Sequence, residues 1–408
     1  MPFQTASNKQ IAIKRQSGLG VPASGAGAAG YNVLPSSSLK LTIAQIVNNV
    51  IRRDGQSARN RHGSRSSMAA YKLPLSQGTL DPILEAALRG TFTAPIVITQ
   101  ASVLNGSAAA GNMTTTTTTI VATSGSFLTQ GVTRGQKIKL TGAHAAANNG
   151  PWFRVVAVTA LVVTVAGTAP LTLDAVAATT WTLTIAKQLL NPQTLIERYH
   201  TVEEYGQDMD LSILGTDMKV SKITFNAQPD ALIEMEVTLM GLNAVGQTTG
   251  TSPVLTGPTY ATTLPLVMSD GTIRVGGVDF PVMTGLQWAW DMAGEVPKVI
   301  SSQVGPDVFL APGKLTGSFS AIRSDLTFFN AFSAETPLEF FIDCMEPDVA
   351  DPKDFTEFYI GNATLSDNTP GGIAKSGPDV EQSTWTAGID DQGADHALTT
   401  MAISSSAA

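Results

Sequence analysis

The sequence has little charge, a single cysteine and few aromatic side chains. Charged residues make up 14% of its 408 residues and aromatic residues 6%, whereas a charged share of about 25% is usual. Because Cys344 has no second cysteine to pair with, no intrachain disulfide can form, and we expect folding in a reducing cytoplasm. No apolar run reaches the roughly 18 residues of a membrane helix, so we expect no membrane partner. Residues 1–16 also lack the apolar core of a signal peptide.

Motifs typical of nucleotide-binding enzymes are missing as well. The glycines of "GAGAAG" (25–30) have the spacing of a dinucleotide-binding loop, but such a loop joins a strand to a helix. Pro35 opposes a helix after this segment. A flexible N-terminal arm explains the glycines better than a cofactor site does, and we expect no cofactor.

Candidate metal and nucleophile sites are equally weak. The four histidines (positions 62, 144, 200 and 396) are scattered, and none has metal-ligand spacing with Cys344. No histidine lies near Cys344 in the sequence, which favours a buried, inert thiol. The acidic segment "DCMEPDVADPKDFTEF" (343–358) lacks the ligand order of an EF-hand loop, which favours a solvated acidic loop. We therefore expect no bound metal and no enzyme activity.

Hydrophobic alternation predicts a mainly β protein. "SSLKLTIAQIVNNVIR" (37–52), "VSKITFNAQ" (220–228) and "LIEMEVTLMGL" (232–242) alternate as half-buried strands do. In the last segment the side chains expected to face the core are Ile233, Met235, Val237 and Leu239. Glu234 and Glu236 face the other way. Trp288 and Trp290 also share one strand face, which predicts core or subunit packing.

Two short helices are predicted. In "LDPILEAALRG" (80–90), Asp81 is expected to cap the helix, Pro82 to begin it and Gly90 to end it in a left-handed turn. Its core-facing side chains are expected to be Ile83, Leu84, Ala87 and Leu88. The second helix is predicted within "SDLTFFNAFSAE" (324–335), with Ser324 as its cap.

The two helices lie in an internal repeat. "YKLPLSQGT" precedes the first helix and "TFTAPIVIT" follows it, while "GKLTGSFSAIR" and "AETPLEFFID" flank the second. Upstream, "LKLTIAQIVNN" resembles "VMTGLQWAWDM" (282–292) in pattern, and downstream residues 218–241 are aligned with 378–404. We read two copies of one module, a β-sandwich or barrel with one flanking helix.

An insertion interrupts the first copy. It opens with the low-complexity "NGSAAAGNMTTTTTT" and continues as short strands separated by glycine turns. Insertions are least costly in surface loops, so we expect a small β domain that hangs outside the assembly and is dispensable for the core. The expected division is 1–35 N-terminal arm, 36–99 with 190–245 first module, 100–189 insert, 246–257 linker, and 258–408 second module.

Charge is divided unequally along the chain. Residues 1–193 contain 16 Lys and Arg against 4 Asp and Glu, a formal charge of +12, whereas residues 194–408 contain 9 against 29, a charge of −20. Such asymmetry is typical of a basic arm for nucleic acid or of copies that dock basic surface on acidic surface. Two unlike surfaces with no partner are the third interpretation.

The basic residues concentrate in "RRDGQSARNRHGSR" (52–65). Its candidate contact residues are Arg52, Arg53, Asp54, Arg59, Arg61 and Arg65. A solvated loop and a DNA contact are both open interpretations, but the loop has no aromatic residue on which bases could stack. Guanidinium groups form bidentate bonds with carboxylates. We therefore favour docking of this loop on acidic surface of a neighbouring copy.

Several segments together resemble one viral family. They are "KRQSGLGVPASG", "YNVLPSSSLKLT", "VIRRDGQSARNRHG" and "GTLDPILEAALRG". As a set they resemble the N-terminal half of the tail tube proteins of long-tailed phages (siphophages). "FLTQGVTRGQKIKLTGAHAAANNGPWFRVVAVT" in the insert is similar to an accessory β domain of phage structural proteins. The resemblance covers most of residues 10–245, and the rest of the chain joins it through the repeat.

The resemblance implies a structural virion protein that self-assembles into stacked rings, forming the hollow tail tube through which phage DNA passes during ejection. Family rings are typically six-fold, so a duplicated subunit implies a trimeric ring with pseudo-six-fold symmetry. The implied partners are other copies and further tail proteins (tape measure, tail terminator and distal tail), with phage DNA in transit without tight binding. Assembly in the bacterial host cytoplasm and residence in the virion tail are expected. The family hairpin that matches the arginine segment reaches the adjacent subunit or ring.

The lumen candidates are Glu234 and Glu236, because acidic or neutral walls do not hold DNA. Exposure of both on the tube exterior is the other interpretation. The alternative function is a virion surface or adhesin-like β protein whose insert binds glycan or a host factor.

Overall fold

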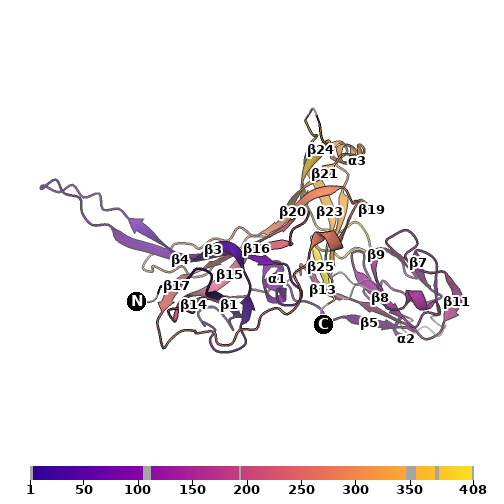
Figure 1. Cartoon of the computed structure of the whole chain (residues 1–408), viewed down its shortest axis with the longest axis horizontal. Coiled ribbons are helices and arrows are strands. Elements are labelled where there is room, and N and C mark those ends of the chain that lie inside the picture. The colour runs from indigo at the N-terminus through magenta and orange to yellow at the C-terminus, as the bar shows by residue number, and fades with distance from the viewer. Residues whose placement is uncertain (1–2, 104–111, 193, 346–354, 373–375, 407–408) are drawn as a thin grey trace.

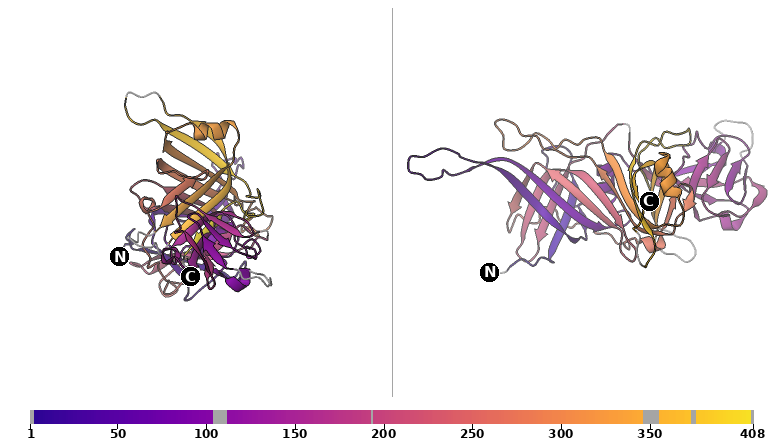
Figure 2. Two further views of the ribbon diagram at one scale, coloured as in Figure 1. Left: turned by 90° about the vertical axis from the view of Figure 1, so that its right-hand side faces the viewer. Right: turned by 90° about the horizontal axis from the view of Figure 1, so that it is seen from above.

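The computed structural model describes residues 3–103, 112–192, 194–345, 355–372 and 376–406. Within them the fold is mainly β, as the alternation predicted, and strands β1 to β25 form two sheets. The molecule is elongated (Figures 1 and 2). A long hairpin projects at one end, the insertion lies at the other, and the C-terminal part rises between them.

Strands of the N-terminal part and of residues 200–247 form what we call the first repeat. Its strands are β1 (Lys9–Arg15), β2 (Ala29–Tyr31), β3 (Leu34–Ile46), β4 (Arg61–Pro74), β14 (His200–Gly206), β15 (Leu211–Ala227), β16 (Glu234–Gly241) and β17 (Asn243–Gln247). Helix α1 (Asp81–Leu88) belongs to it. The expected N-terminal arm includes β1 and β2, and β1 pairs with β14 from Lys9 to Arg15. The glycine-rich segment 25–30 thus leads into a strand rather than a helix.

The second repeat comprises the C-terminal strands. They are β18 (Thr272–Val275), β19 (Val278–Asp279), β20 (Met283–Asp291), β21 (Lys314–Ile322), β22 (Leu338–Met345), β23 (Phe355–Thr369), β24 (Val380–Ala387) and β25 (Ala402–Ser405). Helix α3 (Thr327–Ser333) lies between β21 and β22, and the 3-10 turn η2 (Met268–Asp270) precedes β18.

The strand pairings of the two repeats correspond one to one. The matching pairs are β1–β2 with β18–β19, β1–β14 with β18–β22, β14–β15 with β22–β23, β15–β16 with β23–β24, β15–β17 with β23–β25, β4–β16 with β21–β24, and β3–β4 with β20–β21. Even the bulges agree, because the register shifts at Ser221 in β15 and at Ser366 in β23. The duplication is therefore present in the backbone.

Two details of the sequence alignment of the repeats were wrong. Residues 218–241 (β15 and β16) correspond to β23 and β24, not to residues 378–404. The strand after the first helix, β5 (Ile96–Thr99), pairs with β12 (Thr182–Ile185) of the insertion, so it is not the counterpart of β22. Core identities differ so much between the repeats that only the pairing reveals the register: Val237, for example, corresponds to Ser383.

The two repeats are joined edge to edge. β15 pairs antiparallel with β20 from Lys222↔Asp291 to Ala227↔Leu286. This junction makes one continuous sheet in the order β3-β4-β16-β15-β20-β21-β24-β23. One face of that sheet is apolar and covered, and the other is polar.

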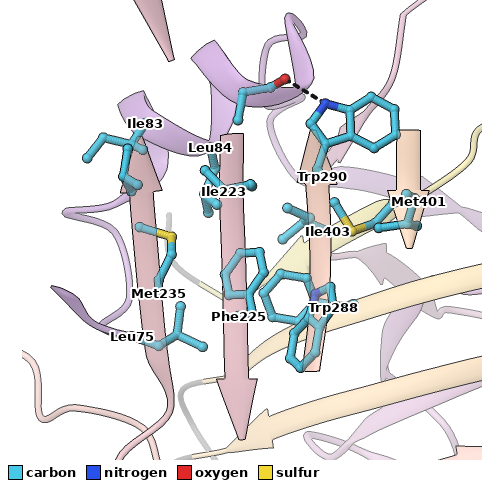
Figure 3. Close-up of a cluster of buried hydrophobic side chains, with 14 of the residues drawn as sticks. Leu75, Ile83, Leu84, Ile223, Phe225, Met235, Trp288, Trp290, Met401 and Ile403 are labelled. Carbon is cyan, nitrogen blue, oxygen red and sulfur yellow. Dashed lines mark hydrogen bonds between the residues drawn. The ribbon is translucent and has the colours of Figure 1, made fainter. Parts of the chain in front are cut away.

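The covered face contains large aromatic side chains (Figure 3). Trp288 and Phe225 are fully buried and stack at a centroid distance of 5.0 Å. The Trp290 indole donates a hydrogen bond of 3.0 Å to the carbonyl of Ala87, which ties α1 to the second repeat. Both tryptophans are thus core residues, as predicted. Gly317 lies where a Cβ atom would stand 2.2 Å from the Trp385 ring, so only glycine leaves room for that ring.

Both predicted helices form, but their caps differ from those predicted. Asp81 is the first helical residue and its carboxylate accepts from Lys187 Nζ at 2.6 Å, with no side-chain cap on α1. Arg89, not Gly90, takes the left-handed conformation, at φ 54°. At α3 the N-cap position is Leu326 rather than Ser324. The carboxylate of Asp325, one residue earlier, accepts a hydrogen bond from the Thr327 amide at 2.8 Å. The predicted core-facing residues of α1 are buried.

The insertion forms a second sheet, here called the insert sheet, in the order β11-β6-β7-β10-β9-β8-β12-β5. Besides β5 and β12 it contains β6 (Met113–Thr115), β7 (Thr119–Ala122), β8 (Lys137–Thr141), β9 (Trp152–Val158), β10 (Val162–Val165) and β11 (Asp174–Ala178), with α2 (Gln100–Val103) and η1 (Ala146–Asn148) between strands. Strand β13 (Lys187–Leu190) follows it and pairs with β25. Much of the low-complexity entry (104–111) lies outside the described residues.

Buried ion pairs join the insert sheet to the second repeat. Lys137 of β8 and Arg154 of β9 contact Asp343 of β22 and Glu357 of β23, and all four side chains are less than 10% exposed. Arg154 Nε lies 2.9 Å from Glu357 Oε2, and Arg154 Nη2 lies 3.1 Å from Asp343 Oδ2. Burial raises the pKa of the Glu357 carboxyl, and the charge of Arg154 counters this. Gly135 approaches the Tyr359 ring where a Cβ would clash.

Cys344 is buried in β22, and burial raises the pKa of its thiol, which matches the inert thiol expected. Most of the acidic segment that follows it (346–354) lies outside the described residues. Elsewhere in the described chain, no group of three or more His, Cys, Asp or Glu side chains is arranged to hold a metal ion.

Candidate subunit interface

The β3–β4 hairpin extends far beyond the body of the molecule (Figure 1). β3 and β4 pair antiparallel as far as Ile46↔Arg61, and residues 47–60, here called the hairpin tip, connect them. The arginine-rich segment therefore spans the tip and the first part of β4. Its position at the end of a long projection makes it available to another molecule.

The candidate contact residues are not equivalent. Arg52 Nη2 lies 2.6 Å from Asp54 Oδ2, so these two exposed side chains satisfy each other. Arg65 is held within the chain, because its amide donates to the Gln303 carbonyl at 2.7 Å and its Nη2 donates to Gln303 Oε1 at 2.5 Å. Arg53, Arg59 and Arg61 are exposed, and within the described residues they form no ion pair.

Apolar side chains accompany the arginines at the tip. Ile51 is 97% exposed, and Ile46, Val47 and Val50 are each more than half exposed. Exposed apolar groups beside cations are typical of protein–protein contacts rather than of contacts with a phosphate backbone. The apolar run "IVNNVI" (46–51) directly before Arg52 is the sequence signal for this contact, which the charges alone did not reveal.

The corresponding segment of the second repeat, residues 292–313 between β20 and β21, lies against the first repeat. We call it the second-repeat loop. Its Asp307 accepts hydrogen bonds from Tyr199 Oη at 3.0 Å and from Lys219 Nζ at 3.1 Å. Its Gln303 and Val304 meet Arg65. Within one chain, therefore, this loop from one repeat docks on the other repeat.

The uncovered face of the continuous sheet, here called the polar face, contains three long rows of cross-strand neighbours. The rows are Ala70, Thr238, Lys222, Asp291, Lys314; then Lys72, Glu236, Thr224, Ala289, Thr316, Thr386; then Glu234, Asn226, Gln287, Ser318, Thr384, Asp367. None of these residues is buried. Serine, threonine and amide side chains make up eight of these seventeen residues, and the charged ones nearly balance, with three lysines against four carboxylates.

Glu234 and Glu236 are both on this polar face, half-buried, while their neighbours Met235 and Val237 are fully buried. The sequence predicted that these two glutamates alternate with core residues, but it did not predict which charged residues lie beside them. Lys72 lies directly opposite Glu236 on β4, and Lys222 Nζ lies 3.6 Å from Asp291 Oδ2. The alternating threonines and serines of β21 and β24 are the sequence signal for this polar face.

The fold and these surfaces define a mainly β protein with a duplicated sheet, one polar face and a projecting hairpin. A family model for phage tail tube proteins matches residues 6–387. The chain therefore belongs to the phage tail tube protein family, as the sequence resemblance suggested, and the family is structural rather than enzymatic. No curated protein matches the chain closely enough to count as a relative.

In the described residues no helix is long and apolar enough to cross a membrane.

Proposed function

We propose that copies of this protein assemble into rings that stack into the tail tube of the phage virion, with the polar face lining the channel. The observation that carries the proposal is the continuous sheet of two matching repeats, covered on one face and uncovered on the other. A sheet of this kind, curved into a ring, gives a wall with a hydrophobic interior and a hydrated inner surface.

The ring is a trimer with pseudo-six-fold symmetry. Because each chain carries two repeats with the same strand pairings, three chains supply six equivalent units. The β15–β20 junction within the chain serves as the pattern for the contact between chains. Closed rotational symmetry is the usual solution for repeated contacts of one kind.

The hairpin tip docks on a neighbouring copy. The second-repeat loop, its counterpart, already docks on the first repeat through Asp307. By the same relation, the tip meets a second repeat of another copy, in the subunit alongside or in the adjacent ring, where acidic residues prevail. Arg53, Arg59 and Arg61 supply the charge and Ile51 the apolar contact.

The channel conducts DNA without holding it. The polar face carries three lysines, Lys72, Lys222 and Lys314, and a slightly larger number of carboxylates, including Glu234 and Glu236. A wall of short polar side chains with balanced charge offers no row of cations to the phosphates. The insert sheet contributes nothing to these rows, which supports its position on the tube exterior.

The remaining partners are the tail proteins that cap, fill and end the tube. The protein assembles in the cytoplasm of the bacterial host before it resides in the virion tail.

Purified protein examined by negative-stain electron microscopy and native mass spectrometry tests the proposal. Rings or tubes of trimers are the expected result. Monodisperse monomers that bind glycans on an array would instead support an adhesin-like surface protein.

A further inference from the structure

Two strand edges of the continuous sheet lack partners within the described residues. β3 pairs with β4 on one side alone. The last residues of β23, including Asp367 to Thr369, pair with β24 on one side alone, because the pairing of β23 with β22 ends at Ala363. β3 is a long strand of 13 residues, whereas the open part of β23 is short. Unpaired strand edges invite association with another chain.

The repeat relation shows that these two edges are a matched pair. β3 corresponds to β20, and β23 corresponds to β15, by the strand pairings given above. β20 and β15 are the strands that join the two repeats of one chain, from Lys222↔Asp291 to Ala227↔Leu286. The free edges of β3 and β23 are thus the counterparts of the β20 and β15 edges that pair within the chain. They stay open because the chain contains only two repeats.

The register follows from the bulges. The shift at Ser221 matches the shift at Ser366, so Lys222 corresponds to Asp367 and Thr224 to Thr369. On the other strand, Met68 of β4 corresponds to Thr316 of β21 through the β4–β16 and β21–β24 pairings. Because Lys40 pairs with Met68 and Ala289 pairs with Thr316, Lys40 corresponds to Ala289. Since Thr224 pairs with Ala289 within the chain, Thr369 of one copy faces Lys40 of another.

We propose that β23 of one copy pairs antiparallel with β3 of a second copy, with Thr369 opposite Lys40, Asn368 opposite Leu41 and Asp367 opposite Thr42. The occupant of each free edge is therefore this same protein. The inference rests on the proposed ring and specifies its contact. Repeated around the ring, the pairing closes the sheet and leaves no edge exposed.

Side chains at the two edges suit this contact. Asp367 and Thr369 are exposed on β23, as are Lys40 and Thr42 on β3. In the proposed register Lys40 lies diagonally across from Asp367, at a separation that long side chains bridge. The junction within the chain has an ion pair of the same type, in which Lys222 Nζ lies 3.6 Å from Asp291 Oδ2.

Cysteine crosslinking tests the register, because the native Cys344 is fully buried. Two single variants, Thr369→Cys and Lys40→Cys, are mixed, assembled and oxidised. Directly opposed strand positions come close enough for a disulfide after small adjustment, so covalent dimers are expected from the mixture and from neither variant alone. The double variant is expected to give a covalent trimer.

The register control replaces Lys40→Cys with Ser36→Cys, four residues along the same strand and also exposed. It is expected to crosslink to Thr369→Cys at least tenfold less. Equal yields from both partners, or no crosslink in variants that electron microscopy shows to form tubes, would overturn the pairing while leaving the tube intact. A wild-type chain that never forms rings would overturn both the proposed function and this contact.

Discussion

Arg154 of the insert sheet and Glu357 of β23 form a buried ion pair, with 2.9 Å between Nε and Oε2, although 203 residues separate them in the chain. Glu357 is fully buried and Arg154 nearly so. Loss of one partner leaves the other charge buried without compensation. The pair therefore ties the folding of the second repeat to the insertion.

Arg154→Met is expected to lower the free energy of unfolding by about 3–5 kcal/mol, the usual cost of breaking a buried pair. Thermal or urea denaturation measures it. Lys222→Met is the matched control, because its pair with Asp291 is more than 40% exposed on both sides and such pairs contribute at most about 1 kcal/mol. Adding Glu357→Met to Arg154→Met is expected to restore much of the loss; a double variant as unstable as the single one would argue against the pair.

Deletion of the insertion is a related test. The sequence favoured a dispensable insertion, but replacing residues 96–185, from the start of β5 to the end of β12, with a Gly/Ser linker removes both Lys137 and Arg154. The deletion is expected to leave a less stable chain, because Asp343 and Glu357 lose their cations. Asp343→Asn with Glu357→Gln in the deleted chain is expected to recover solubility and ring formation. A deleted chain as stable as wild type, by circular dichroism melting, would contradict this coupling.

The hairpin tip gives a test of stacking. Arg53→Glu combined with Arg59→Glu and Arg61→Glu is expected to leave the fold and its melting temperature unchanged and to shorten tubes at physiological salt, because three exposed cations become anions. Electron microscopy measures tube length. The control is Arg52→Glu with Asp54→Arg, which keeps the local charge while reversing an exposed pair. Tubes of normal length from the triple variant would remove these arginines from the contact.

His200 gives a pH dependence. Burial is the main cause that lowers its pKa to about 4, with Arg15 and Arg198 adding to the effect. The unfolded chain, with a histidine pKa near 6.5, binds the proton first as the pH falls. The contribution of neutral His200 to the free energy of unfolding is therefore fully present above pH about 6.5. It is lost as the pH falls from about 6.5 to 4, by up to about 3 kcal/mol.

The variant His200→Leu uses the residue that stands at the matching position of the second repeat, Leu338. It is expected to flatten the decline in unfolding free energy between pH 6.5 and 4, as followed by urea titration at several pH values. His144→Gln is the control, since His144 is exposed in the insertion. An unchanged slope in His200→Leu would show that His200 does not titrate differently on unfolding.

Local patterns predicted the local structure of this chain. The alternation around Met235 and the apolar spacing of α1 needed no distant partner, so β16 and the helix core residues were predicted correctly. Arg65 was placed with the free arginines because its partner Gln303 lies 238 residues away. The basic residues of the insertion were overlooked for the same reason, since their carboxylates lie in β22 and β23. Pairing between distant strands decides these roles, and no local pattern encodes it.

The polar face provides the last prediction. Its charges nearly balance in the wild type, so assembled tubes are expected to bind duplex DNA weakly and with little dependence on salt. Glu234→Lys with Glu236→Lys replaces two carboxylates of β16, the strand next to β4, with ammonium groups. Both side chains are only half-buried, so we expect the fold to tolerate the change.

Tubes of this double variant are expected to assemble normally, to bind duplex DNA with an affinity that falls steeply between 50 and 200 mM salt, and to slow ejection in reconstituted phage. The charge-matched control is Glu335→Lys with Asp391→Lys, which are exposed and lie outside the polar face. DNA binding is measured by filter retention of intact tubes. If the control tubes bind DNA as tightly as the double variant, Glu234 and Glu236 lie on the exterior, because the two variants carry the same added charge and differ only in whether it faces the channel. Tight, salt-sensitive binding by wild-type tubes would contradict the proposed neutral channel itself.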